Sequence, residues 1–164
     1  ILSTDFSNVN AVIDGAFKKI SLKDYAGKYV VLLFYPFDFT YVCPTELIAF
    51  SDSMQRFKDM DTAVLGIQLT LTSLTCMDQD LEEGGGVGKL NFPLLADISK
   101  DISHHYGVLV NDPEDDLYGA ALRGLYIIDG NGKIRSVQIN DAPVGRSVDE
   151  LSLIHISEPT RPRL

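Results

Sequence analysis

The sequence predicts an α/β domain with a mixed central sheet and helices on both faces. Two apolar runs, residues 29–35 and 63–67, are rich in β-branched and aromatic side chains, as buried parallel strands are. A segment with helical spacing of apolar residues follows each run. Residues 124–128 and 134–139 flank a turn at 129–133 and indicate an antiparallel hairpin. Parallel strands joined by helices, together with an antiparallel pair, produce a mixed sheet.

The elements expected in the first half of the chain follow from local signals. Residues 6–20 should form a hairpin, because Asp14 and Gly15 suit a two-residue turn. Residues 21–25 should form a short helical turn ahead of the first buried strand. A helix is predicted over 44–60, since its apolar residues recur at every third or fourth position. These apolar residues are Leu47, Phe50, Met54 and Phe57.

The second half alternates weaker helical segments with strands. Residues 73–83 predict a helix that ends in the glycines of 84–88. Residues 92–97 are expected to be a loop or a short strand, and residues 101–106 a short helix ended by Gly107. The thioredoxin-like fold has this order of elements, and no internal repeat or linker divides the chain.

Composition limits the classes of partner. The chain has 164 residues, 45% of them hydrophobic, which suffices for one domain with a proper core. Its 23 acidic and 14 basic side chains give a net charge of −9, which argues against a nucleic-acid partner. No apolar stretch reaches membrane-spanning length, so no membrane partner is expected. Two cysteines without a C-x-x-C motif do not make a secreted disulfide framework, and we expect a reducing, cytoplasmic location.

The carboxyl-terminal segment differs from the rest of the chain. From Leu151 to Arg161 it resembles one reading frame of a transposase adapter used in sequencing libraries. We therefore expect one domain over residues 1–150 and an artefactual tail over 151–164. A natural carboxyl-terminal segment is the alternative.

Cys43 is the residue whose setting points most directly to chemistry. It lies between the apolar run 29–35 and the predicted helix, and Pro44 suits the first position of that helix. The unpaired N–H groups and the dipole at a helix start favour a thiolate, which is the nucleophilic form of cysteine. The alternative is a buried structural cysteine.

The residues around Cys43 resemble a known family. The pattern Pro36-x-x-x-Thr40-x-x-Cys43 is similar to the peroxiredoxin active-site motif, and residues 39–46 resemble its typical two-cysteine subclass. Residues 123–129 and 140–147 are similar to two further blocks of that subclass.

The resemblance, which runs from Phe6 to Glu150, implies a cysteine peroxidase without metal or haem. It would reduce hydrogen peroxide and small organic hydroperoxides, with thioredoxin as the reductant. The resemblance also implies a homodimer or a ring of dimers, for which residues 134–139 are a candidate edge strand. The alternatives are an oligomeric redox-regulated chaperone or peroxide sensor, and a thioredoxin-like oxidoreductase. The last is disfavoured because Cys43 has no second cysteine at C-x-x-C spacing.

The resemblance assigns a role to each catalytic residue. Cys43 supplies the thiolate, and the Thr40 hydroxyl lies beside the sulfur and the peroxide, although it could instead cap the helix. Arg123 is the cation that stabilises the thiolate and the transition state. Pro36 shields the intermediate from water, although it could simply terminate the strand.

Supporting residues follow from the same resemblance. Glu46 could compensate the helix dipole or orient Arg123, and the resemblance favours the second role. Arg146 carries over as a further charge near the site. The resolving thiol of the subclass lies in the partner subunit's carboxyl-terminal tail. Cys76 does not fall in that position and is interpreted as a structural or incidental thiol.

Two further segments complete the comparison with the family. Residues 85–88 resemble the Gly-Gly-Leu-Gly motif of peroxide-sensitive members, with a flexible glycine loop as the alternative. Residues 68–77 depart from the family pattern, and the chain has no Trp. His104 and His105 are adjacent and have no obvious third ligand, so we expect a solvated pair and no metal site.

Overall fold

The computed structural model describes residues 5–36, 42–69, 90–141, 146 and 148, and for residues 42–45 the backbone alone. In this part of the chain seven strands form one sheet in the order β2-β1-β5-β4-β3-β6-β7. The strands are β1 Val9–Ile13, β2 Ala16–Ile20, β3 Tyr29–Phe34, β4 Thr62–Gln68, β5 Leu94–Ala96, β6 Arg123–Ile128 and β7 Ile134–Asn140. The helices are the 3₁₀ helix η1 Leu22–Tyr25, α1 Val42–Asp52, α2 Met54–Asp59 and α5 Asp101–His105.

The sheet is mixed, as the sequence predicts. Strand β4 lies parallel to both β3 and β5, whereas β6 runs antiparallel to β3 and to β7. The amino-terminal hairpin turns at Asp14 and Gly15, whose φ angles of 51° and 75° confirm the predicted tight turn. This hairpin joins the sheet because β1 pairs antiparallel with β5. Nothing in the local sequence indicates that last pairing.

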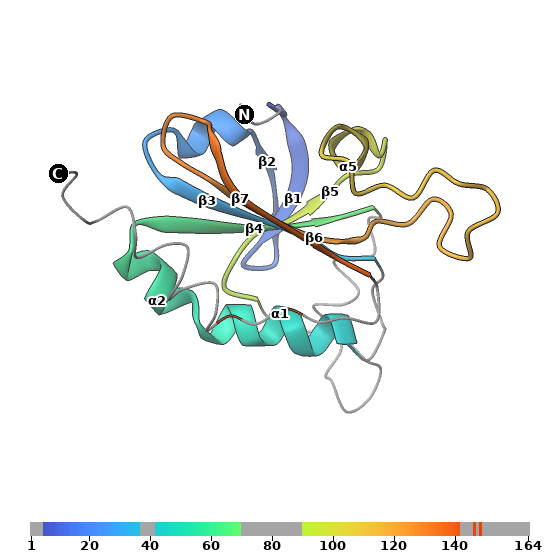
Figure 1. Cartoon of the computed structure of the whole chain (residues 1–164). Helices are drawn as coiled ribbons and strands as arrows, with labels where there is room; N and C mark the ends of the chain where they lie inside the picture. Colours follow the sequence, from blue (N-terminus) through green and yellow to red (C-terminus); the bar gives the residue numbers. More distant parts are fainter. Residues whose placement is uncertain (1–4, 37–41, 70–89, 142–145, 147, 149–164) are drawn as a thin grey trace, which may run out of the picture.

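Alternating residues of β3 build two cores, one on each face of the sheet. Val31 and Leu33 pack on the face covered by α1 and α2, while Leu32 and Phe34 pack on the face of α5. Figure 1 shows these helices on opposite sides of the sheet, which confirms the predicted layering. A fully apolar strand is thus explained by burial on both faces.

The face of α5 contains an aromatic cluster. The rings of Phe34, Tyr106 and Tyr126 lie with centroids 5.0–5.7 Å apart in tilted or edge-on arrangements, which aromatic rings prefer. The Tyr126 hydroxyl donates a hydrogen bond to the backbone oxygen of Tyr106, and burial raises the pKa of Tyr126. The cluster therefore satisfies its polar atom while it fills this face of the core.

The single helix predicted over 44–60 is wrong in one respect, because the structure divides it into α1 and α2. At Ser53 the backbone leaves the helical region with φ −94° and ψ 5°, and its N–H donates to both Ala49 and Phe50 oxygens at 3.2 Å. The apolar stripe continues across this break, and Leu47, Phe50, Met54 and Phe57 are all buried. Periodicity reports the buried face of a helix but not a one-residue interruption of its backbone.

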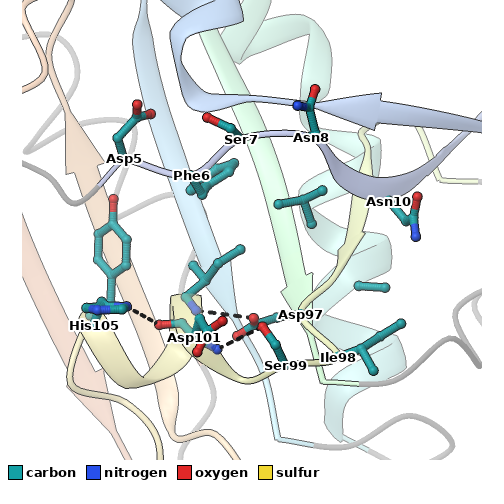
Figure 2. Close-up of a pocket in the computed structure, with 14 residues that line it drawn as sticks. Asp5, Phe6, Ser7, Asn8, Asn10, Asp97, Ile98, Ser99, Asp101 and His105 are labelled. Carbon is teal, nitrogen blue, oxygen red and sulfur yellow. Dashed lines mark hydrogen bonds between the residues drawn. The ribbon is translucent and has the colours of Figure 1, made fainter.

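The start of the short helix α5 depends on a side chain that precedes it. Lys100, just before the helix, has a left-handed φ of 64°. The Asp97 carboxylate accepts hydrogen bonds from the N–H groups of Ile102 at 3.2 Å and Ser103 at 2.8 Å. Figure 2 shows Asp97 beside this helix start. These N–H groups belong to the first turn, where a helix offers no backbone acceptor. Asp97 therefore stabilises the helix start from outside it.

The remaining predicted elements divide into two groups. The loop or strand at 92–97 contains β5, and the predicted short helix at 101–106 is α5, followed by Gly107 with φ 75°. The predicted helix at 73–83, the glycines of 84–88 and the tail of 151–164 lie outside the described residues. No helix of the described part is long and apolar enough to cross a membrane.

Candidate active site

The candidate thiol lies in the first turn of α1, close in sequence to the end of β3. Because α1 begins at Val42, Cys43 is its second residue and Pro44 its third, two positions later than the sequence predicts for Pro44. The first turn still tolerates proline, since its N–H groups have no intrahelical acceptor. Cys43 thus occupies a helix start as predicted. Thr40, Cys76 and the side chain of Cys43 lie outside the described residues.

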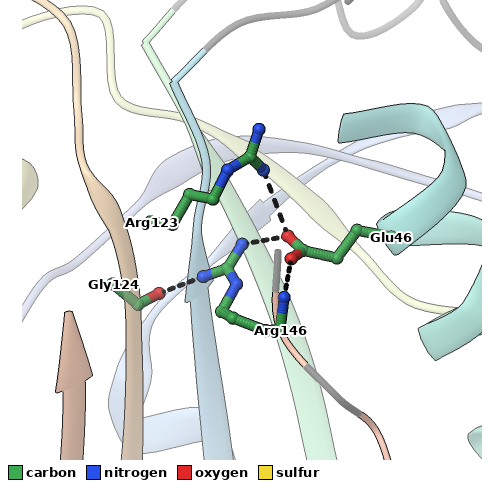
Figure 3. Close-up of polar contacts among 4 residues, drawn as sticks. All are labelled: Glu46, Arg123, Gly124 and Arg146. Carbon is green, nitrogen blue, oxygen red and sulfur yellow. Dashed lines mark hydrogen bonds and ion pairs between the residues drawn. The ribbon is translucent and has the colours of Figure 1, made fainter. Parts of the chain in front are cut away.

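Glu46 lies one turn further along α1 and accepts hydrogen bonds from two arginines. Arg123 Nη1 lies 3.4 Å from Glu46 Oε1, and Arg146 Nη2 donates to the same oxygen. The backbone N–H of Arg146 donates to Glu46 Oε2 at 2.8 Å. Figure 3 shows both guanidinium groups directed at the one carboxylate. The predicted pair of Glu46 and Arg123 is therefore present, and Arg146 joins it.

The three charged groups of this cluster are removed from solvent. The side chains of Arg123, Arg146 and Glu46 are 2%, 0% and 4% exposed. One carboxylate cannot neutralise two guanidinium groups, so the cluster carries a net positive charge in a poorly screened environment. Such a cluster favours an anion nearby, and the first turn of α1 carries a thiol that can become one.

The hairpin of β6 and β7 brings the two arginines to α1. Arg123 is the first residue of β6 and pairs with Asn140 at the end of β7. Arg146 follows β7 in the chain, and its Nη1 donates to the backbone oxygen of Gly124 at 2.6 Å. At Gly124 an added Cβ would lie 2.6 Å from Val108 Cγ1, so glycine allows the close packing of β6 at this point. Strand β6 therefore carries Arg123 and binds Arg146 through the Gly124 oxygen.

Pro36 directly follows the last residues of the β3 run and is buried. It lies where the sequence places it, at the entrance to the segment that leads to Thr40 and Cys43. A buried proline at a strand end needs no hydrogen-bond partner for a backbone N–H.

Tyr35 and Gln68 form a further buried contact for which the sequence predicts no role. The Tyr35 hydroxyl donates to Gln68 Oε1 at 3.4 Å, and both side chains are buried. One signal in the sequence could have indicated Gln68, because the segment 68–77, which departs from the family pattern, begins at this residue.

A cavity of about 590 Å³ lies elsewhere, between the amino-terminal segment and α5 (Figure 2). It shares no residue with the cluster of Glu46, Arg123 and Arg146. His105 lines this cavity, and its Nδ1 contacts the backbone oxygen of Asp101 at 2.6 Å. Within the described ranges, no group of three or more His, Cys, Asp and Glu side chains could hold a metal ion.

Comparisons with known proteins identify relatives of the whole domain. The model of the AhpC/TSA family matches residues 4–137. Peroxiredoxin-2 of Rattus norvegicus is 54% identical over 148 residues, which are 89% of this chain and 71% of the relative. The mitochondrial thioredoxin-dependent peroxide reductase of Drosophila melanogaster is 50% identical over 149 residues, 90% of this chain and 61% of the relative. The crystal structure of reduced Plasmodium vivax 2-Cys peroxiredoxin matches with a TM-score of 0.85 and 36% identity, covering 93% of this chain and 77% of that one.

Proposed function

Since the chain belongs to the AhpC/TSA family and is a thiol-dependent peroxidase of the peroxiredoxin type, we propose that Cys43 is the thiol that reduces the peroxide. The substrates are hydrogen peroxide and small organic hydroperoxides. One observation carries the assignment of the site. The buried, net positive cluster of Glu46, Arg123 and Arg146 lies against the helix whose first turn holds Cys43.

The reaction is a two-electron transfer from sulfur to oxygen. The Cys43 thiolate attacks one peroxide oxygen, the new S–O bond forms, and the O–O bond breaks. The departing oxygen takes up a proton and leaves as water or an alcohol, while Cys43 becomes a sulfenic acid. Arg123 stabilises the negative charge on the thiolate and on the departing oxygen, and the Thr40 hydroxyl donates to the peroxide.

The other site residues prepare this step. Glu46 fixes the guanidinium of Arg123 through the 3.4 Å contact, and Arg146 holds Glu46 from the other side. Because Arg146 also donates to the Gly124 oxygen, it links α1 to β6. Pro36 shields the sulfenic acid from water at the end of β3.

A second thiol returns Cys43 to its reduced form. We propose that a resolving cysteine of a partner subunit condenses with the sulfenic acid to a disulfide, with release of water. Thioredoxin then reduces this disulfide and becomes oxidised itself. The name of the Drosophila relative supports thioredoxin as the reductant.

The exposed edge of the sheet supports a homodimer or a ring of dimers. In the described part of the chain β7 is the last strand of the sheet, and Val137 and Ile139 on it are 51% and 44% exposed. An apolar edge strand readily pairs with another chain, here a second copy of β7. Sedimentation of the full-length gene product at increasing salt should find at least a dimer, and a strict monomer would contradict this pairing.

We place the protein in the cytoplasm, because recycling of Cys43 by a dithiol reductant needs a reducing compartment. The Drosophila relative carries a mitochondrial name, so the two compartments must be compared directly. Fractionation of cells that express the full-length gene product measures this distribution.

A rapid-mixing experiment tests the proposed peroxidase. The reduced protein should consume one peroxide per Cys43 in a fast second-order reaction, and a dimedone-type reagent should label Cys43 afterwards. Cys43→Ser should abolish both signals, whereas the matched change Cys76→Ser should leave the first turnover intact. Full consumption by Cys43→Ser protein would rule out the assignment.

A further inference from the structure

A buried polar pair lies in the apolar core beneath α1, and the reaction described above does not use it. Tyr35 and Gln68 are 0% and 3% exposed, and the Tyr35 hydroxyl donates to Gln68 Oε1 at 3.4 Å. A buried amide or hydroxyl is costly unless it is hydrogen-bonded. Hydrocarbon side chains at both positions would avoid this cost, so the pair calls for a role.

The strand registers place this pair in line with Arg123. The parallel register of β3 and β4 ends at Phe34 opposite Ile67, so Tyr35 and Gln68 are the next neighbours. The antiparallel register of β3 and β6, continued for two residues, places Tyr35 opposite Arg123. Residues directly opposite each other on neighbouring strands point to the same face. Gln68, Tyr35 and Arg123 therefore form a row across three strands.

Three observations indicate that the row is continuous and faces α1. A Cβ on Gly124 would lie 3.4 Å from Phe34 Cδ2, so β3 and β6 remain adjacent at this end of the sheet. Tyr35 belongs to the buried cluster that contains Leu47 and Phe50 of α1. Arg123, at the other end of the row, pairs with Glu46 of the same helix.

We infer that Gln68 is a positioning residue for the peroxide reaction, and that it acts by fixing Tyr35 beneath α1 and beside Arg123. This inference rests on the proposed function. Tyr35 contributes to the packing under α1 and immediately precedes Pro36, where the segment leading to Cys43 begins. Without the Gln68 oxygen, the Tyr35 hydroxyl would lose this hydrogen bond, which helps to fix the position of the ring in the core. Displacing reacting groups by about 1 Å can cost about 10²-fold in rate.

Three variants test this role. Gln68→Met keeps the length of the side chain without its amide, and Tyr35→Phe keeps the ring without its hydroxyl. Each should lower the second-order rate constant of Cys43 with hydrogen peroxide by about tenfold, and the double variant should lose no more than either single one. The pH midpoint of the rate should also rise in each, because a less well placed Arg123 stabilises the thiolate less.

The melting temperatures of the same three variants provide a second, independent measurement. Each single change removes one side of the hydrogen bond between Tyr35 and Gln68, whereas the double change removes both sides. Because this hydrogen bond is already lost in either single variant, the losses in melting temperature should not simply add in the double variant, and its rate should stay low. A purely structural pair would show the change in melting without the change in rate.

Thr62→Val is the matched control. Thr62 lies at the opposite end of β4, is 4% exposed, and donates from Oγ1 to the Met60 oxygen at 3.1 Å. This change should lower the melting temperature and leave the rate constant unchanged.

The outcomes separate this inference from the proposed function. A wild-type rate and an unshifted pH midpoint in Gln68→Met overturn it, and so do losses that multiply in the double variant. If Gln68→Met fails to fold, Tyr35→Phe decides the question by the same criteria. The wild-type protein is measured first, and if it does not react with peroxide, the proposed function itself is refuted along with the inference.

Discussion

Two buried carboxylates on opposite sides of the sheet show how differently a charge can be used in one domain. Glu46 and Asp97 are 6% and 3% exposed. Glu46 accepts hydrogen bonds from the side chains of Arg123 and Arg146, which are 77 and 100 residues away in sequence. Asp97 accepts its hydrogen bonds from backbone N–H groups only five and six residues away.

This contrast shows that the role of a buried carboxylate is indicated by the groups it contacts and not by the extent of its burial. Glu46 gathers two fixed cations at one point and leaves a net positive charge beside a helix start, an arrangement that serves an anionic intermediate. Asp97 replaces the missing acceptors of the first turn of α5, an arrangement that serves the fold. Burial alone would have selected both as candidate catalytic groups.

The largest effect is expected when Glu46 loses its charge. Glu46→Gln keeps the shape of the side chain but removes the negative charge that the buried guanidinium groups of Arg123 and Arg146 both contact. Breaking a buried ion pair from one side typically costs about 3–5 kcal/mol, so the free energy of unfolding should fall by this order. Chemical denaturation measures it, and the same titration of Asp59→Asn, an exposed carboxylate on α2, should show almost no change.

The next largest effect is expected for the rate rather than the stability. Arg123→Ala removes the cation from a site that builds negative charge, and loss of one such group typically costs about 10²–10³ in rate. Stopped-flow oxidation of Cys43 by hydrogen peroxide measures this loss. The matched change Arg56→Ala, on the exposed side of α2, should leave the rate unchanged. An unchanged rate in folded Arg123→Ala protein would remove Arg123 from the mechanism.

A smaller effect is expected at the other carboxylate. Asp97→Ala leaves two N–H groups of the first turn of α5 without their acceptor, and loss of a helix cap costs about 0.5–2 kcal/mol. The melting temperature should fall while the rate constant of Cys43 with peroxide stays at the wild-type value. A lower rate in this variant would show that Asp97 also contributes to the reaction, as Glu46 does.

Local patterns in the sequence predicted much of the fold. Periodicity placed the buried strands around Val31 and Val64, and turn residues placed both hairpins. The pairing of β1 with β5 had no local signal, because strand pairing depends on the whole chain. The break at Ser53 was missed for a different reason, because both sides of the break continue one apolar stripe.

The candidate site was predicted through a motif and not through periodicity. The resemblance named Glu46 and Arg123 as partners, and the structure contains this pair. The row of Gln68, Tyr35 and Arg123 could not be predicted, because it follows from the register of three strands. Asp97 was missed because it precedes α5 by several residues, whereas the usual sequence signature of a cap lies immediately before the helix.

The smallest expected effect is the coupling between the two carboxylate regions, and it is also the most direct test of their independence. Arg123 and Asp97 belong to different faces of the sheet and share no hydrogen bond that involves their side chains. Substitutions at such distant sites usually add to within about 0.3–0.5 kcal/mol. The double variant of Arg123→Ala and Asp97→Ala should therefore show the rate of the first change, and its loss of unfolding free energy should equal the sum of the two single losses.

One backbone contact could link the two regions, and the design of this variant preserves it. The N–H of Asp97 donates to the backbone oxygen of Gln68 at 2.6 Å, and this bond does not depend on the Asp97 carboxylate. A coupling well above the additive range would mean that the carboxylate itself influences the end of β4, and through Gln68 the row that reaches Arg123. In that case Glu46 and Asp97 would belong to one connected network. It would then be wrong to assign Glu46 to the reaction and Asp97 to the fold alone.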